Sequence, residues 1–400
     1  MKKKISLTLI VVMGIMVQAF AQPPKPLEGQ WQGLLDYKET KVPFTFELHY
    51  DNGTPIVTLV NGKERIELNK VKIIGDSIII PMHPFDAEIR AHYDENQMMG
   101  MWKKGYKEEG IPFKANYGVP RYNPSNKNDF KLLKKLSIRF KPEGGPPYDA
   151  VGLFEQENSQ VTGTILTEVG DFRYFEGIVE GDSIKMSSFD GAHGFFLTGH
   201  YVDDKWSGEF YFDSGFKEAW EGVANEQAEL NSPFEEVGPG QRPYFDILTA
   251  GDPDTKIDED KYFDKVLIIQ LFGTWCPNSF DQTNYLVDWY ANNQNKAVDI
   301  LAVSYEANFS TQYGNQRIKD YREEMQVPYD IKLGGPMNKG QAALAFPFID
   351  KVKAFPTLMI VDKNGFVRYM QKYFNGPATG SYYASFDREF NKIIHALLTE

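Results

Sequence analysis

The segment Trp275–Ser279, with sequence WCPNS, holds the one cysteine of the chain and is the strongest candidate for chemistry. Cys276 follows an apolar run and precedes residues with helical spacing, so we expect it at the N-terminus of a helix. The unpaired N–H groups and the dipole at that end favour thiolate over thiol. Pro277 suits the first helical position because it has no N–H to leave unpaired. The sequence therefore predicts a nucleophilic Cys276 with a lowered thiol pKa, provided that the side chain is exposed.

The elements that would position Cys276 form an α/β pattern. The run Val266–Phe272 is almost wholly apolar, as in a strand buried on both faces. A helical pattern then ends at Asn292-Asn293, and Asp299–Val303 predicts the next strand of a right-handed βαβ unit. A lone cysteine is often a small buried hydrophobe, but the place where a strand leads into a helix favours chemistry at Cys276. Further helices are expected around 317–325, 341–348 and 386–398, and a tight Asn-Gly hairpin joins strands at 358–361 and 366–370.

Residues from about Leu27 to Ala224 predict an all-β region, because short alternating stretches of β-forming residues are separated by Gly, Asn and Asp turns. The segment 156–184 repeats the segment 50–78 at a constant offset of 106 residues. Each copy ends in Gly-Asp-Ser-Ile and is followed by an aromatic-Asp pair, Phe85-Asp86 or Phe189-Asp190. The repetition predicts a duplicated β unit, either two small barrels or one double sandwich. We assign it no chemistry and expect its tryptophans in the core: Trp31, Trp102, Trp206 and Trp220.

The N-terminus predicts export from the cytoplasm. Three lysines precede the apolar run Ile5–Val17, and Ala19-Phe20-Ala21 then offers the small residues that a signal peptidase recognises. We expect cleavage after Ala21 and a mature protein in the periplasm or secreted. The run is shorter than the roughly 20 apolar residues that a membrane span needs, and no later stretch is apolar for long enough. We therefore expect no membrane span after cleavage.

The charge and residue counts exclude several functions. A formal net charge of −12 opposes binding to nucleic acid and to anionic membrane surfaces. The histidines fall in no metal-ligand spacing, and no phosphate loop or G-x-S-x-G elbow is present, so we expect neither a metal nor another cofactor. With one cysteine, no intramolecular disulfide can form, and any disulfide must join another molecule. The sequence leaves the oligomeric state open.

Two segments resemble the signatures of a known family. Residues 272–279 are similar to the redox motif of the TlpA/ResA-type thioredoxin-like proteins, which are exported thiol-disulfide oxidoreductases with W-C-x-x-C at this point. Residues 354–365 resemble the second signature, in which the proline is cis and faces the active cysteine. The resemblance covers the chain from about Tyr244 to Glu400. It implies catalytic roles for Cys276, Ser279 and Pro356, and substrate binding by Trp275, Pro277, Phe355 and Thr357.

The predicted organisation is multidomain, with an all-β N-terminal region followed by an α/β thioredoxin-like domain. The duplicated β region is similar to the N-terminal additions of such proteins from Bacteroidetes-like bacteria. The predicted boundaries are a signal peptide at 1–21, β repeats at 22–125 and 126–230, a linker at 231–243 and the thioredoxin-like domain at 244–400.

Three departures from the family pattern limit the chemistry. Ser279 replaces the resolving cysteine, and a hydroxyl cannot attack a mixed disulfide. Gln270 and Gln282 replace an Asp and a Glu that handle protons in the family. Three hypotheses remain. The first is monothiol exchange with a disulfide- or thiol-containing protein or a small thiol, resolved by an external thiol. The second is a non-catalytic peptide- or protein-binding module, and the third is a thiol peroxidase acting through a sulfenic acid.

Overall fold

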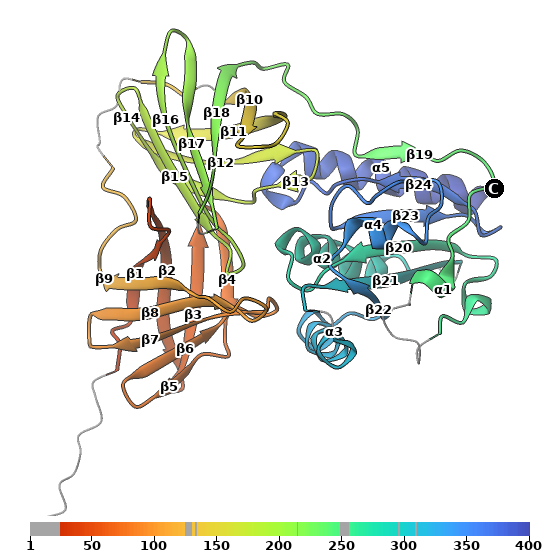
Figure 1. Ribbon diagram of the computed structural model, residues 1–400, viewed down its shortest axis with the longest axis horizontal. Helices are drawn as coiled ribbons and strands as arrows, with labels where there is room; N and C mark the ends of the chain where they lie inside the picture. The colour runs from red at the N-terminus through yellow and green to blue at the C-terminus, as the bar shows by residue number, and fades with distance from the viewer. Residues whose placement is uncertain are drawn as a thin grey trace, which may run out of the picture.

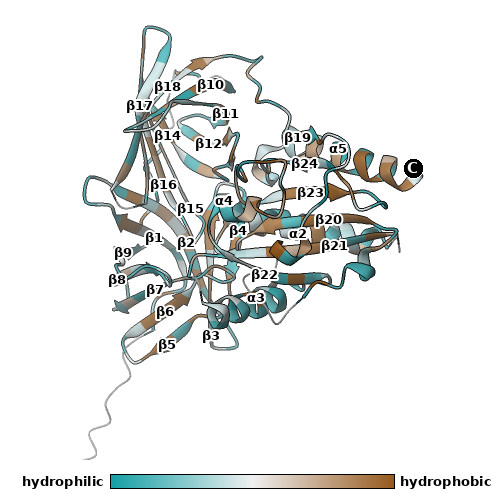
Figure 2. Ribbon diagram, turned by 45° about the vertical axis from the view of Figure 1, so that its right-hand side comes forward, coloured by the Kyte–Doolittle hydropathy of each residue, from teal (hydrophilic) through white to brown (hydrophobic). Residues whose placement is uncertain are grey.

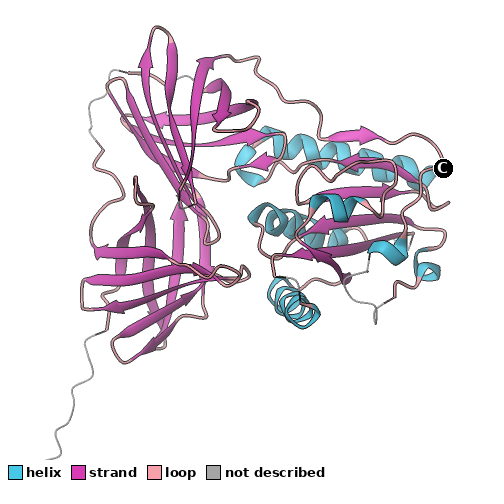
Figure 3. Ribbon diagram, in the orientation of Figure 1, coloured by secondary structure: helices cyan, strands magenta, loops and turns pink. Residues whose placement is uncertain are grey.

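The computed structural model describes residues 25–400 apart from 125–129, 133, 214, 249–255, 295–296 and 309. The predicted signal peptide lies outside the described residues. The N-terminal part of the chain forms two neighbouring β units, and an α/β domain packs against both of them (Figure 1). All the described helices belong to the α/β domain (Figure 3). The predicted class, an all-β region followed by an α/β domain, is confirmed.

The first β unit is a curled antiparallel sheet of nine strands. Strand β1 pairs with both β2 and β9, and the strands follow one another in chain order around the sheet. Alternate residues along these strands are buried, as in β7, because successive side chains point to opposite faces. The strands are β1 (Gly29–Asp36), β2 (Lys41–Asp51), β3 (Thr54–Asn61), β4 (Glu64–Leu68), β5 (Lys72–Ile74), β6 (Ser77–Pro81), β7 (Ala87–Tyr93), β8 (Gln97–Lys104) and β9 (Ile111–Tyr117).

The second β unit also has nine strands, and it closes into a barrel because β11 pairs with β12 as well as with β10. Closure leaves the main strands without free edges. The strands are β10 (Lys135–Pro142), β11 (Tyr148–Glu157), β12 (Gln160–Thr167), β13 (Gly170–Asp171), β14 (Phe175–Glu180), β15 (Ser183–Phe189), β16 (Gly194–Val202), β17 (Lys205–Phe212) and β18 (Phe216–Ala224).

The two β units are structural copies of each other, as the sequence repeat predicts. Strand β1 begins at Gly29 and β10 begins at Lys135, which is the same offset of 106 residues. The repeated Gly-Asp-Ser-Ile places the Ser77 hydroxyl 3.3 Å from His92 Nδ1 in one copy and the Ser183 hydroxyl 3.0 Å from His200 Nδ1 in the other. The four tryptophans lie in the cores at 2% exposure or less: Trp31, Trp102, Trp206 and Trp220.

The α/β domain is a six-stranded sheet in the order β19-β24-β23-β20-β21-β22. Strands β20 and β21 are parallel and joined by α2, which confirms the predicted βαβ unit, and β23 and β24 form the predicted hairpin. The strands are β19 (Phe234–Glu236), β20 (Val266–Phe272), β21 (Val298–Glu306), β22 (Asp330–Pro336), β23 (Thr357–Val361) and β24 (Val367–Gln371). The helices are α1 (Phe245–Leu248), α2 (Pro277–Asn292), α3 (Thr311–Met325), α4 (Lys339–Ala343) and α5 (Ser381–Thr399), with short 3-10 turns at Glu259–Tyr262 and Pro377–Thr379.

Strand β20 is buried along its whole length because both faces of the sheet are covered. Ile268 packs with α2, α3 and α5, whereas its neighbour Ile269 packs with α1 and α4 on the other face. Figure 2 shows hydrophobic residues along β20 and β23 at the centre of the domain. Two covered faces therefore explain the continuous apolar run in the sequence.

The α/β domain differs from the sequence prediction in three places. The segment 231–243, predicted as a linker, contains the edge strand β19, which pairs with β24. Strand β22 was not predicted, because it lies at the sheet edge and carries two glycines that break the apolar pattern. The helix predicted at 341–348 is the shorter α4. The domain boundaries themselves stay predictions.

Arg121 joins the two β units. It follows β9 and is 5% exposed, and its guanidinium donates to the main-chain carbonyls of Val60 in the first unit and of Ser187 in the second, the latter at 3.2 Å. The side chains of Asn61 and Thr45 accept from it as well, at 3.3 Å each. A buried cation with four acceptors fixes the two units relative to each other.

Replacing Arg121 by alanine should lower the thermal unfolding temperature, since it removes four hydrogen bonds from a buried site. We expect a loss of about 2–4 kcal/mol in the free energy of unfolding. The control is Arg90→Ala, because Arg90 is an exposed arginine of β7 paired only with Glu88, and its loss should cost less than about 0.5 kcal/mol. Equal melting temperatures for the two variants would contradict the role of Arg121.

Candidate redox site

Cys276 lies where the sequence predicts, at the junction of β20 and α2. It is the N-cap residue of α2, with extended backbone at φ −104°, and Pro277 occupies the first helical turn. The Cys276 N–H donates to the Gly273 carbonyl at 3.1 Å, which closes a turn between strand and helix. The sulfur therefore sits at a helix N-terminus.

The second predicted segment lies against this cysteine. The Phe355-Pro356 peptide bond is cis, and the Cys276 thiol donates to the Phe355 carbonyl with an Sγ to O distance of 3.4 Å. Trp275 lies edge-on to the Phe355 ring at 6.2 Å between centroids, and its indole N–H donates to the Tyr305 carbonyl at 2.8 Å. Thr357 begins β23, and its hydroxyl donates to the Ala354 carbonyl at 2.8 Å. The structure thus brings together the residues singled out in the sequence, and their individual roles stay predictions.

A low thiol pKa was predicted only for an exposed Cys276, and this condition is not met in the structure. Burial raises the pKa of the thiol, since the residue is only 8% exposed and a buried thiolate loses its hydration. Hydrogen bonds from the Ser279 side chain and from the main-chain N–H groups of Ser279 and Asn278 oppose the rise, and the charge of Asp190 adds to it. The helix N-terminus lowers the thiol pKa, as predicted, but burial raises it by more.

Three amides beside the site form a buried chain. Gln270 donates to the Gln282 side chain at 3.1 Å, and Gln282 donates to the Gln371 side chain at 2.8 Å. All three residues are 0% exposed. Because an amide does not titrate, this chain holds β20, α2 and β24 together without supplying or accepting a proton.

Glu306 is a buried carboxylate that sequence reasoning missed. It ends β21 at 2% exposure and accepts from the Thr274 hydroxyl at 2.8 Å and from the Thr274 N–H at 3.3 Å. Burial raises its pKa, against hydrogen bonds from Ser304 and Thr274. Through Thr274 it positions the turn that carries Cys276. The only signal for it in the sequence is a carboxylate at the end of a buried strand.

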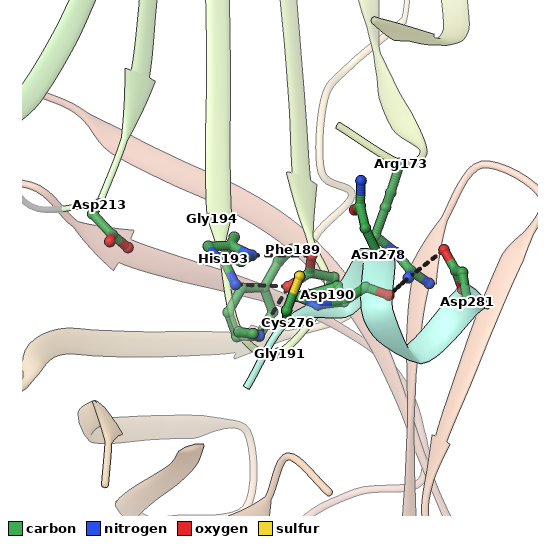
Figure 4. A network of polar contacts seen from close by, with 12 residues as sticks. Arg173, Phe189, Asp190, Gly191, His193, Gly194, Asp213, Cys276, Asn278 and Asp281 are labelled. Carbon is green, nitrogen blue, oxygen red and sulfur yellow. Dashed lines mark hydrogen bonds and ion pairs between the residues drawn. The ribbon is translucent and has the colours of Figure 1, made fainter. Parts of the chain in front are cut away.

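Residues of the β units complete the surroundings of the thiol. Figure 4 shows Asp190 of the second unit beside Cys276, and its charge acts on the thiol. Burial would raise the pKa of the Asp190 carboxyl, but hydrogen bonding and the charge of His193 lower it, so the group is a carboxylate. Tyr106 of the first unit is close enough for Cys276 to act on its pKa. The sequence did not predict that either β unit reaches the cysteine.

Arg173 of the second β unit forms a buried ionic cluster next to α2. It is 4% exposed, and its guanidinium donates to Glu64 of the first unit, to Asp281 of α2 at 2.6 Å and to the Pro277 carbonyl at 3.0 Å. Burial raises the pKa of Asp281 to about 7, with Arg173 opposing and the carboxylates of Asp171 and Glu64 adding to the rise. One side chain thus connects all three domains, and Figure 4 shows Arg173 next to Asp281 of α2.

Three comparisons place these features among known proteins. Residues 242–370 match the AhpC/TSA family. No curated protein matches the chain. Among solved structures, the chain is similar to a thiol:disulfide interchange protein of the thioredoxin family from Chlorobium tepidum TLS, at 17% identity over 43% of this chain and 99% of that one, with a TM-score of 0.28.

Two further solved structures are similar to parts of the chain. A thiol-disulfide isomerase from Corynebacterium glutamicum is 11% identical over 42% of this chain and 97% of its own, with a TM-score of 0.28. A redesigned beta barrel is 11% identical over 24% of this chain and 92% of its own, with a TM-score of 0.20.

The strand order, the βαβ unit and the family match define the class of protein. It is a multidomain protein in which a large all-β region precedes a thioredoxin-like domain. Within the described residues, no group of three or more His, Cys, Asp or Glu side chains could hold a metal ion. None of the helices in the described part of the chain is long and apolar enough to cross a membrane.

The raised pKa predicts that the Cys276 thiol ionises at a higher pH than an ordinary thiol. We expect the midpoint of the thiolate ultraviolet absorbance above the ordinary value of 9.0. Ser279→Ala should move it higher by about one pH unit, because it removes a hydrogen bond to the sulfur. Ser137→Ala, in the second β unit, is the control and should leave the midpoint unchanged. A wild-type midpoint below 9.0 would show that the helix N-terminus prevails.

The raised pKa of Asp281 predicts that the stability of the protein depends on pH. Its pKa in the folded protein, about 7, lies above the ordinary 3.8, so the folded state holds a proton that the unfolded state releases. Its contribution to stability is therefore present at low pH and lost as pH rises through about 7. Asp281→Asn keeps a neutral side chain, so its melting temperature should fall less than that of the wild type between about pH 5 and about pH 8. Parallel melting profiles would refute the shifted titration.

Proposed function

We propose that the protein is an exported thioredoxin-like protein that exchanges thiols and disulfides through Cys276 alone. The observation that supports this most is the Cys276 sulfur at the N-terminus of α2, 3.4 Å from the carbonyl of Phe355, which precedes cis-Pro356. Main chain next to the sulfur can pair with an extended disulfide substrate. Export rests on the predicted signal peptide at 1–21.

The exchange needs only one sulfur of the protein. The Cys276 thiol loses its proton, and the thiolate attacks one sulfur of the substrate disulfide. The substrate S–S bond breaks, a mixed disulfide with Cys276 forms, and the departing sulfur leaves as a thiolate that takes up a proton. An external thiolate then attacks the substrate sulfur of the mixed disulfide and frees Cys276. One disulfide is replaced by another, so no further oxidant or reductant is required.

Neighbouring residues have supporting roles in this proposal. The Ser279 hydroxyl donates a hydrogen bond to the sulfur and favours its ionised form. Trp275 and Pro277 flank the cysteine on the helix side, while Phe355 and Thr357 present main chain on the other side. Pro356 keeps the Phe355 carbonyl directed at the sulfur. Substrates are proteins or small molecules that contain a disulfide or a thiol.

A non-catalytic binding module is the second candidate. The raised thiol pKa and the buried amides at Gln270 and Gln282 favour it, because neither feature promotes proton removal from Cys276. In that case the groove at Pro356 would hold an extended peptide without forming a covalent bond.

Incubation with oxidised glutathione should distinguish the two candidates. Under the exchange proposal, the folded full chain gains one glutathione on Cys276, detected by mass spectrometry, and added dithiothreitol removes it. Cys276→Ser should gain none. An adduct that forms only after denaturation would favour the binding module. Hydrogen peroxide that oxidises Cys276 to a sulfenic acid faster than the disulfide reacts would favour a peroxidase.

A further inference from the structure

Each β unit presents an equivalent turn to the thioredoxin-like domain. In the first unit, the turn between β6 and β7 carries Phe85, whose ring lies edge-on to Phe280 of α2 at 5.7 Å between centroids. The next residue, Asp86, accepts from the hydroxyl of Tyr313 in α3. In the second unit, the turn between β15 and β16 carries Asp190, which lies beside Cys276 (Figure 4). Phe85 and Asp86 of the first unit and Asp190 of the second thus lie on the side that faces the thioredoxin-like domain.

The turn over Cys276 is held firmly by both β units. Its own Asp190 side chain accepts from the main-chain N–H groups of Ala192 at 2.8 Å and His193 at 2.6 Å. The indole of Trp102 in the first unit donates to the Gly191 carbonyl at 3.1 Å. The ring of Phe189 lies in the core of the first unit. A turn fixed in this way keeps Asp190 near Cys276 as long as the β units stay in place.

The contact between the β units and α2 is close and polar. The Asn278 side chain, two residues after Cys276, donates to the Asp171 carbonyl at 3.1 Å. A Cβ atom added at Gly170 would lie 2.3 Å from the Asn278 side-chain nitrogen, so only glycine fits at this approach. The Gly376 N–H donates to the Asp171 carboxylate at 2.7 Å. Polar contacts of this kind are typical of domain interfaces that open and close.

We propose that the two β units form an inhibitory cover over Cys276, held closed by the buried Arg173 cluster, and that the cover must open before a substrate reaches the thiol. This inference rests on the proposed exchange function and concerns the regulation of the same site. The cover accounts for the 8% exposure of Cys276 at a helix N-terminus. It also prevents an extended substrate from lying beside the Phe355 carbonyl.

Arg173 is the group whose loss should open the cover. Its guanidinium links Glu64 of the first unit to Asp281 and the Pro277 carbonyl of α2, and it is 4% exposed. Without this cation, buried carboxylates face one another across the interface. The exposed ion pairs at the rim, Lys353 with Glu168 and Lys70 with Glu324, are expected to contribute little.

The test measures how fast Cys276 of the full chain is alkylated by iodoacetamide and by a maleimide that carries a poly(ethylene glycol) chain. In Arg173→Met we expect the rate with the large reagent to rise by at least about tenfold. Arg139→Met is the matched control, since Arg139 is an exposed arginine of the same β unit paired with Asp149. Its rate should equal that of the wild type.

A second variant keeps the test informative if Arg173→Met does not fold. Glu64→Gln removes one charge of the cluster at constant shape, and it should accelerate alkylation in the same direction, though less. Circular dichroism verifies that each variant is folded. Folded variants that react at the wild-type rate would overturn the cover, as would a wild-type Cys276 that reacts as fast as in the denatured chain.

Alkylation separates the failure of the cover from the failure of the exchange function. A variant that is alkylated quickly but gains no glutathione from oxidised glutathione would leave the cover standing and refute the exchange. A wild-type protein that gains glutathione as quickly as the Arg173→Met variant would support the exchange and refute the cover.

Discussion

The docking of the two β units against the α/β domain involves one buried cation, Arg173. Arg173 is almost completely removed from water, and a charge in that position is stable only when it is paired and hydrogen-bonded. Its partners, Glu64 and Asp281, come from two other domains, so the cluster forms only when the three domains meet. Its geometry is prepared locally, because the Asp171 side chain accepts from the Arg173 N–H at 2.8 Å. The charge of Arg173 is therefore buried in this cluster only when the domains dock.

The protonation state of Cys276 depends on its burial. Two opposing influences act on its thiol: the N–H groups of α2 and the Ser279 hydroxyl favour the thiolate, whereas burial favours the thiol. Burial destabilises the thiolate more than these hydrogen bonds stabilise it. Cys276 thus lies where a nucleophile would be expected, at a helix N-terminus, but its burial favours the protonated thiol. Under the cover proposed above, access to the thiol depends on the interface between the domains as well as on the segment WCPNS.

The interior beside the site contains a chain of buried amides. The side chains of Gln270, Gln282 and Gln371 hydrogen-bond to one another, so they leave no buried polar gap. Glu306 remains as a buried carboxylate, but it binds Thr274 rather than the sulfur. These contacts hold the shape of the site.

The sequence by itself determined the elements and the junction that carries Cys276. Three signals are local or periodic and can be recognised without a structure. They are the apolar run of β20, the helical spacing of α2 and the repeat at 106 residues. It missed β19 and β22, because edge strands are short or half-buried and leave a weak pattern. Only the tertiary structure decided that Cys276 is buried. Asp190 lies 86 residues before Cys276 in the chain and Tyr106 lies 170 residues before it, and no local pattern encodes a proximity that exists only after separate domains have folded and docked.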